Sequence, residues 1–271
     1  MNFEPLEYQK LLESIRFIYG YDFTEYAESS VKRRIALFMQ TRKIDTLEDL
    51  GKLLFKDERV FAEFVQELSV TVTEMFRNPS FYRSLRERVL KRLATYPVIK
   101  IWIAGCATGE EVYSVAILLQ EEQLLHRSII YATDINQRSL QTARRGSYPL
   151  DTMKAYEKNY RETGGTADFA QYYTLERGTA VLDRALQQNV VFSPHNLAAD
   201  KSFNEFQLII CRNVLMYFNQ NLQDKVTTLF YDSLCSLGML GLGDKESLLF
   251  SGKKESFEEF DRKEKIFMKI Q

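Results

Sequence analysis

The spacing of apolar residues changes near residue 97, and this change limits the folds that are open to the chain. Upstream, apolar positions recur every three or four residues with no β-branched alternating run, which is typical of amphipathic helices. Downstream, short apolar runs such as 99–103 and 129–133 are each followed by a helical pattern. This alternation predicts βαβ units and a parallel, doubly wound sheet. We therefore expect an all-helical N-terminal domain at 1–95 and an α/β domain at 96–271.

Two helix-start signals mark the helical region. Thr46, with Asp49 three residues later, resembles a capping box. Asn78 followed by Pro79 places an N-cap residue before a proline at the first helical position, which predicts a further helix. The linker between the domains is expected after this helix, near 96–97.

Within the α/β domain, the segment 148–188 interrupts the alternation of strands and helices. Gly164, Gly165 and Gly178 separate short strand-like runs there, so we predict an inserted β-subdomain with a small antiparallel element. After the insertion we expect, in order, strands at 190–193 and 206–211, an amphipathic helix at 219–237 closed by Gly238, a strand at 239–243, and two antiparallel strands within 257–270.

A glycine turn between the first predicted strand and its helix is a candidate ligand site. Gly105 and Gly109 would let the backbone approach a nucleotide-like ligand at the carboxyl end of the strand, although helix packing explains most G-x-x-x-G pairs. The spacing differs from the dinucleotide G-x-G-x-x-G pattern, and the turn lacks the Lys and Ser/Thr of a P-loop. Glu110 and Glu111, at the helix start, would repel phosphate. The turn therefore favours a cationic, hydroxyl-rich ligand, and S-adenosylmethionine, with its sulfonium, ammonium and ribose, fits.

An acidic residue follows the second predicted strand. Asp134 stands where a carboxylate can accept hydrogen bonds from ribose hydroxyls. On position alone, Asp134 or Asn136 could instead cap the next helix. The glycine turn and this acid together favour a class I S-adenosylmethionine-dependent methyltransferase, with its Rossmann-like sheet, over other nucleotide-binding folds.

The composition limits which partners and which cellular compartment we expect for the protein. The 36 Lys and Arg residues nearly cancel the 37 Asp and Glu residues, so no whole-protein field attracts nucleic acid or anionic lipid. No apolar run approaches the ~20 residues that span a bilayer, and the acidic N-terminus is unlike a signal peptide. We expect a cytoplasmic protein without membrane insertion. Cys106, Cys211 and Cys235 lack metal-ligand spacing, which predicts reduced, buried thiols and no metal site.

Several segments in register resemble the CheR-type chemotaxis methyltransferases. They are LSVTVTEMFR at 68–77 with the following Asn78-Pro79, WIAGCATGEEVYSVA at 102–116, the acidic strand and helix that include 132–148, His195-Asn196-Leu197, ICRNVLMYF at 210–218, and the closing strand around 264–266. The resemblance runs through nearly the whole chain. It implies transfer of a methyl group from S-adenosylmethionine to glutamate side chains in the cytoplasmic helices of methyl-accepting chemoreceptors, with S-adenosylhomocysteine as the product.

The resemblance also implies a set of site residues. Together with Gly105 of the turn, those expected to contact the cofactor are Thr71, Thr73, Arg77, Glu111, Asp134, Asn196, Leu197, Arg212 and Asn213. Arg77 is also expected to hold the attacking carboxylate, and Tyr217 to orient it beside the transferred methyl. A glutamate, with a reference pKa of about 4.3, is ionised at neutral pH and needs no general base, so proximity and in-line orientation dominate. Thr71 departs from the Asn that is common in the family.

A basic stretch in the helical region is a candidate surface for a partner. Its residues are Lys32, Arg33, Arg34, Arg42 and Lys43. Such a run is usually a solvated face, whereas the resemblance suggests that it docks acidic, glutamate-bearing receptor helices. The inserted segment resembles the family's β-subdomain, which in some members grips a receptor tail. Two alternatives stay open, namely a methyltransferase acting on another substrate and a module that binds S-adenosylmethionine without catalysis. We expect a monomer.

Overall fold

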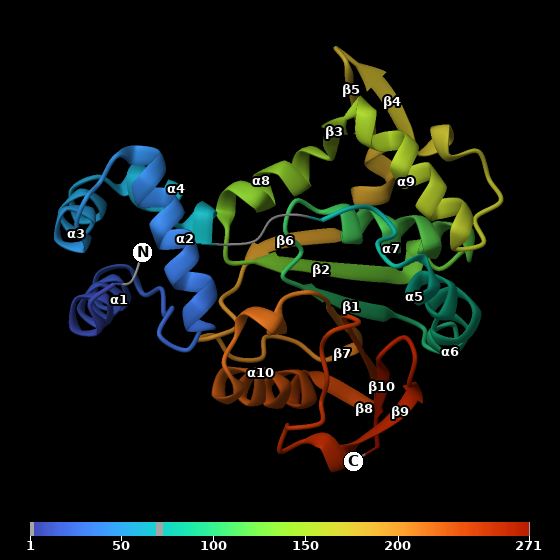
Figure 1. Ribbon diagram of the computed structural model, residues 1–271. Helices are drawn as coiled ribbons and strands as arrows, with labels where there is room; N and C mark the ends of the chain where they lie inside the picture. The colour runs from blue at the N-terminus through green and yellow to red at the C-terminus, as the bar shows by residue number, and fades with distance from the viewer. Residues whose placement is uncertain (1–2, 69–72, 271) are drawn as a thin grey trace.

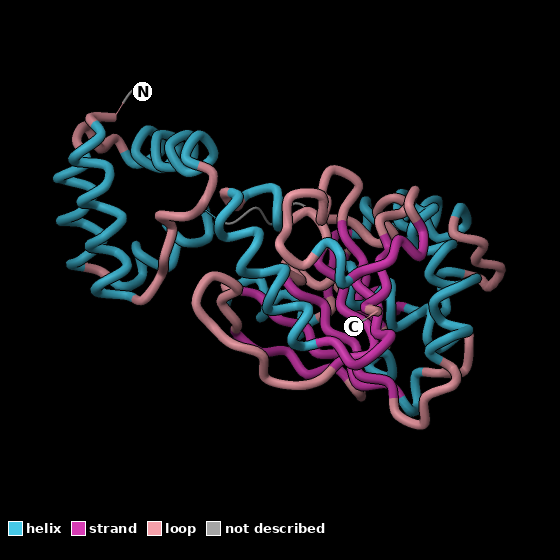
Figure 2. The backbone as a smooth tube through the Cα atoms, turned by 90° about the horizontal axis from the view of Figure 1, so that it is seen from below, coloured by secondary structure: helices cyan, strands magenta, loops and turns pink. Residues whose placement is uncertain are grey.

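The computed structural model describes residues 3–68 and 73–270 and contains two parts (Figures 1 and 2). The N-terminal part consists of the helices α1 (Pro5–Tyr19), α2 (Glu28–Arg42), α3 (Leu47–Lys56) and α4 (Glu58–Leu68). They enclose a core of their own, in which Ile15, Ile35 and Phe64 are fully buried. Thr46 caps α3, and its hydroxyl oxygen accepts the Asp49 N–H at 3.1 Å. The predicted all-helical N-terminal domain is confirmed, and so is Thr46 as a helix cap, although the Asp49 side chain accepts the Thr46 hydroxyl rather than the backbone N–H of a full capping box.

A further helical segment lies on the far side of the sheet from α1–α4 (Figure 1). It comprises α5 (Pro79–Ser84), a π-helical turn (Leu85–Val89) and α6 (Leu90–Leu93). Phe81, Tyr82 and Leu85 are buried in the same apolar cluster as the central strands. These contacts favour a domain boundary ahead of this segment, whereas the boundary at residue 95 stays a prediction from the sequence.

A seven-stranded sheet forms the centre of the C-terminal part. Its strands are β1 (Ile99–Ala104), β2 (Ser128–Asp134), β6 (Val190–Pro194), β7 (Phe206–Cys211), β8 (Leu234–Leu242), β9 (Phe257–Asp261) and β10 (Ile266–Lys269). The order is β6-β2-β1-β7-β8-β10-β9, with parallel pairing from β6 to β8 and antiparallel pairing of β10 with both β8 and β9. The helices that cover it are α7 (Glu110–Glu121) and α8 (Gln137–Arg145) on one face and α10 (Gln220–Ser233) on the other (Figure 1). The strand order reverses between β1 and β7, so the predicted doubly wound sheet is confirmed.

The end of α10 differs from the expectation. The predicted helix at 219–237 stops at Ser233, and β8 already begins at Leu234 rather than at residue 239. Pairing of β7 with β8 shifts register between Phe206 and Leu208. A Cβ on Gly238 would lie 3.1 Å from the Phe206 carbonyl oxygen, so this glycine serves an irregular strand pairing and not a helix end.

The inserted segment contains a helix that the sequence analysis missed. Its strands β3 (Ser147–Pro149), β4 (Tyr173–Glu176) and β5 (Thr179–Leu182) form a separate antiparallel sheet of order β3-β5-β4, so the predicted β-subdomain is confirmed. Between β3 and β4 lies α9 (Leu150–Glu162). Only Met153, Tyr156 and Tyr160 of this helix are buried. They are three and four residues apart, which is the helical period that the strand-like reading overlooked.

Two expectations from composition can be compared with the structure. Cys106, Cys211 and Cys235 are free and buried, as predicted. Burial raises the pKa of all three thiols, which disfavours the reactive thiolate. No helix within residues 3–68 and 73–270 is long and apolar enough to cross a membrane.

Candidate active site

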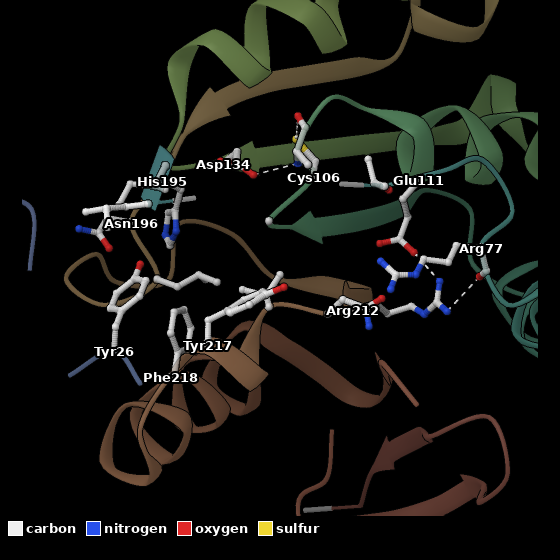
Figure 3. A pocket seen from close by; sticks show the side chains of 18 of the residues that line it. Tyr26, Arg77, Cys106, Glu111, Asp134, His195, Asn196, Arg212, Tyr217 and Phe218 are labelled. Carbon is white, nitrogen blue, oxygen red and sulfur yellow. Dashed lines mark hydrogen bonds and ion pairs between the residues drawn. The ribbon is translucent and has the colours of Figure 1, made fainter. Parts of the chain in front are cut away.

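A pocket opens where β1, β2 and β7 end, at the switch point of the sheet (Figure 3). Its empty volume is about 970 Å³, a figure that includes the opening to solvent. The predicted cofactor and catalytic residues that line it are Thr73, Arg77, Gly105, Glu111, Asp134, Asn196, Leu197, Arg212, Asn213 and Tyr217. Thr71 lies outside the described residues. Figure 3 shows Asn196 at one end, Glu111 and Arg212 at the other, and Tyr217 between them.

The two glycines of the turn after β1 are required by packing. Both have left-handed φ angles, 77° at Gly105 and 97° at Gly109. A Cβ on Gly105 would lie 2.5 Å from Cγ2 of Val214, and a Cβ on Gly109 would lie 2.8 Å from Cβ of Ala143 in α8. A side chain at either position would therefore displace a neighbouring loop or helix. Close packing of the protein itself, more than room for a ligand, explains these glycines.

Asp134 ends β2 and faces the turn. Its Oδ2 accepts a hydrogen bond from the Ala107 N–H at 2.8 Å, and its Oδ1 accepts one from the Asn136 N–H at 2.8 Å. The cap of α8 is Asn136, whose side chain accepts the N–H groups of Arg138 and Ser139. Burial raises the pKa of Asp134, and the backbone N–H groups partly offset this rise. A carboxylate has about four lone-pair sites, so Asp134 can still accept a ribose hydroxyl.

Replacing Asp134 with alanine should lower the affinity for S-adenosylhomocysteine by about tenfold or more, because charge-assisted hydrogen bonds are worth about 1.5–3 kcal/mol each. Titration calorimetry measures this affinity. Asn136→Ala is the matched control, since it removes the cap of α8, at a cost of about 1 kcal/mol in stability, without removing a pocket carboxylate. An equal loss of affinity in both variants would show that Asp134 acts only through the turn and helix it holds.

A buried ion pair forms the opposite end of the pocket. Arg212 Nη1 lies 3.0 Å from Glu111 Oε1, and only 3% and 12% of the two side chains are exposed. The same Glu111 oxygen accepts a hydrogen bond from the Tyr82 hydroxyl at 3.0 Å. Arg212 Nη2 donates to the Arg77 carbonyl oxygen at 3.0 Å and to Asn78 Oδ1 at 2.8 Å. The Asn78 side chain therefore binds Arg212 and makes no capping hydrogen bond to α5.

Glu110 faces away from this end, although it adjoins Glu111 in the sequence. Its carboxylate accepts a hydrogen bond from the Thr108 hydroxyl at 2.7 Å, and the residue is buried. This burial raises the pKa of Glu110 to about 7. Of the two acids, Glu111 lines the pocket and Glu110 does not. The expectation that both carboxylates favour a cationic ligand is therefore corrected to Glu111 alone.

Glu246 holds the loop that follows β7, and the sequence analysis did not identify it. Its Oε2 accepts the N–H groups of Gly243 at 2.7 Å and Asn213 at 3.0 Å. Its Oε1 accepts those of Val214 at 2.8 Å and Met216 at 3.3 Å. Burial raises the pKa of Glu246, and these N–H groups oppose the rise. A carboxylate just beyond a parallel strand next to the switch point is the signal that could have identified it.

Residues 195–197 follow β6 and form the wall beside Asp134. The His195 N–H donates to the Asp134 carbonyl oxygen at 3.2 Å, and the His195 ring packs edge-on against Trp102 with centroids 5.1 Å apart. His195 Nε2 lies 3.3 Å from the Lys201 carbonyl oxygen. Because a carbonyl only accepts, this contact assigns a proton to Nε2. Contacts of both the backbone and the ring of His195 therefore fix the position of this wall.

Some side chains of the basic stretch make contacts within the helical domain itself. Three of its side chains make contacts in the pairs Lys32–Glu28 at 2.6 Å, Arg34 with the Glu67 carbonyl oxygen at 2.6 Å, and Arg42–Glu63. Arg33 and Lys43 are exposed and have no ion-pair partner in the described part of the chain. These two residues are the ones available to an external partner.

Side chains that the sequence analysis did not predict also reach the pocket. Tyr26 and Leu68 come from the helical domain, and Glu74 from the segment between the domains. Leu68 and Glu74 belong to the segment 68–77 that carries the resemblance, whereas the place of Tyr26 depends on how the two domains pack, so no local pattern marks it.

The charges of the pocket suit a cationic ligand. Glu74, Glu111 and Asp134 face Arg77 and Arg212, so three carboxylates against two guanidiniums leave one net negative charge. S-adenosylmethionine carries a net positive charge and a ribose whose hydroxyls suit the acid at the end of β2. The fold, the switch-point pocket and this acid define a class I S-adenosylmethionine-dependent methyltransferase.

Comparisons with known proteins identify the family. Residues 71–266 match "CheR methyltransferase, SAM binding domain", and residues 6–69 match "CheR methyltransferase, all-alpha domain". The chain is 48% identical to "Putative methyltransferase Cher3" of Pseudomonas putida over 97% of both chains. It is 30% and 31% identical to "Chemotaxis protein methyltransferase" of Listeria monocytogenes and of Listeria innocua, over 85% of this chain and 86% of each relative. The chain belongs to the CheR methyltransferase family, and its cofactor is S-adenosylmethionine.

Proposed function

We propose that this protein transfers the methyl group of S-adenosylmethionine to glutamate side chains of methyl-accepting chemoreceptors and so forms glutamate methyl esters. The observation that carries the proposal is that Arg77 and Tyr217, which are far apart in the sequence, line one pocket together with the predicted cofactor residues. Relatives in two Listeria species bear the name chemotaxis protein methyltransferase, which supports a chemoreceptor as the methyl acceptor.

Methyl transfer to a carboxylate requires mainly that the protein position the two reacting groups. A carboxylate oxygen attacks the sulfonium methyl, the O–CH₃ bond forms as the S–CH₃ bond breaks, and S-adenosylhomocysteine leaves. An ionised glutamate supplies the nucleophile without a base, so the protein must align it and exclude water. Arg77 would hold the carboxylate through charge-assisted hydrogen bonds, and the Tyr217 hydroxyl would orient it. The guanidinium of Arg212 is committed to the pairing with Glu111.

The receptor-facing surface is proposed to follow α2. The start of this helix lies beside the pocket, because the Ala27 N–H donates to the Tyr217 carbonyl oxygen at 2.8 Å. Along α2 the exposed Arg33 is followed by Leu37, which is 50% exposed, and Lys43 lies just past the helix end. A receptor helix that carries glutamates would meet both apolar and basic contacts here.

The methyl acceptor is tested by transfer of radiolabel from S-adenosylmethionine to a cytoplasmic chemoreceptor fragment. We expect label on the fragment that mild base releases, as it does from a methyl ester. A base-stable product, or no transfer by protein that binds the cofactor, would contradict the proposed function.

Charge reversal tests the docking surface separately. Arg33→Glu with Lys43→Glu should slow transfer by roughly tenfold at low salt and flatten its salt dependence, because steering by exposed charges is screened by ions. Lys91→Glu with Arg262→Glu is the control: both residues are exposed, and they introduce the same charge change away from α2. Cofactor affinity should match the parent in both double variants. Equal transfer rates in the two double variants would show that the basic side chains along α2 are only solvated and do not steer a partner.

A further inference from the structure

Tyr26 brings the helical domain into the cofactor pocket. The residue lies between α1 and α2 and forms an isolated antiparallel bridge with Phe218. Its ring also packs edge-on against the Phe218 ring, with centroids 4.9 Å apart and an interplanar angle of 70°. Both residues line the pocket. The contact therefore joins the two domains at the wall of the site.

Backbone hydrogen bonds on both sides of Tyr26 set its position. The Ala27 N–H donates to the Tyr217 carbonyl oxygen at 2.8 Å, and the Asn219 N–H donates to the Glu25 carbonyl oxygen at 2.8 Å. The Glu25 carboxylate also pairs with a lysine of α10. Tyr26 cannot leave the pocket without breaking these bonds, so its side chain is a fixed part of the site.

The hydroxyl of Tyr26 is directed into the pocket. Figure 3 shows it pointing toward Asn196. Within residues 3–68 and 73–270 this hydroxyl has no hydrogen-bond partner, whereas the hydroxyl of Tyr19 in the same domain donates to the Leu54 carbonyl oxygen at 2.7 Å. Burial and the nearby Asp134 carboxylate raise the pKa of Tyr26, so its hydroxyl keeps its proton. A neutral donor is thus available to a ligand.

The position of the Tyr26 hydroxyl determines which part of the cofactor it can contact. Asp134 and Asn196 mark the end of the pocket where an acid after the second strand binds ribose, and Glu111 and Arg212 lie at the other end (Figure 3). We propose that the Tyr26 hydroxyl hydrogen-bonds the adenosyl part of S-adenosylmethionine. The bound cofactor then fixes the helical domain against the α/β domain.

Tyr26→Phe tests the contact, because it keeps the ring against Phe218 and deletes only the hydroxyl. Calorimetry on the full chain should show a three- to tenfold weaker affinity for S-adenosylhomocysteine, which is about the value of one neutral hydrogen bond. 5′-Methylthioadenosine lacks the amino-acid part of the cofactor and should lose the same factor. Tyr19→Phe is the matched control, since it removes a hydroxyl bonded within the helical domain and should leave both affinities unchanged.

Hydrogen exchange provides a second readout, and neither measurement needs a methyl acceptor. In the parent, S-adenosylhomocysteine should slow exchange at the Ala27 and Asn219 amides, which bridge the domains. In Tyr26→Phe at saturating ligand this slowing should be smaller. Parental affinity in Tyr26→Phe would overturn the proposal, as would equal losses in Tyr26→Phe and Tyr19→Phe, because the latter result would show general loosening of the domain.

Discussion

Replacing Arg212 with methionine is expected to lower the free energy of unfolding by about 3–5 kcal/mol and to abolish tight cofactor binding. The larger part of the loss arises because Glu111 would keep a buried charge without its partner. The hydrogen bonds to the Arg77 carbonyl oxygen and to Asn78 Oδ1 would be lost as well. Since these contacts join β7, α7 and the segment before α5, the pocket wall loses its common anchor. Chemical denaturation and calorimetry with S-adenosylhomocysteine measure the two effects.

A second substitution separates stability from binding. Adding Glu111→Gln to Arg212→Met removes the unpaired charge and should restore much of the lost stability, while cofactor affinity stays low. Arg86→Met is the matched control, because Arg86 pairs with Glu121 and Glu122 outside the pocket and is 17% exposed. It should destabilise the protein without a comparable loss of affinity. Parental affinity in Arg212→Met would remove Arg212 from the cofactor site.

Arg77→Ala is expected to lose methyl transfer by about 10- to 100-fold or more, because alanine cannot replace charge-assisted hydrogen bonds to the attacking carboxylate. Tyr217→Phe keeps the aromatic wall and deletes the hydroxyl, so it should lower turnover with little change in cofactor affinity. The assay is transfer to a glutamate-containing receptor peptide, with release of the label by base as evidence for an ester.

The double variant shows whether the two residues position one group. If both orient the same carboxylate, the combined loss should be smaller than the sum of the separate losses in free energy. Full additivity would indicate independent roles. Near-parental turnover in both single variants would remove Arg77 and Tyr217 from the mechanism.

Local patterns were sufficient where the structure depends on neighbours along the chain. The spacing of apolar residues identified the helical N-terminal region and the alternating strands and helices, because one turn of helix or one run of strand needs only a few consecutive residues. The capping of α3 by Thr46 is equally local. The same approach failed at α9, whose buried face consists of only three residues, and at the start of β8, where pairing with β7 ends α10 early.

The motifs also placed the pocket, since Arg77, Asp134 and Tyr217 were all named from the sequence and all line it. For two residues that shape the site, only the tertiary structure determined that they belong to it. Glu246 binds the loop after β7 through four backbone N–H groups, and Tyr26 reaches the pocket from the other domain. The N–H groups of this loop find their acceptor, and the Tyr26 ring finds Phe218, only because folding brings these residues near each other, and this proximity leaves no repeat or spacing in the sequence.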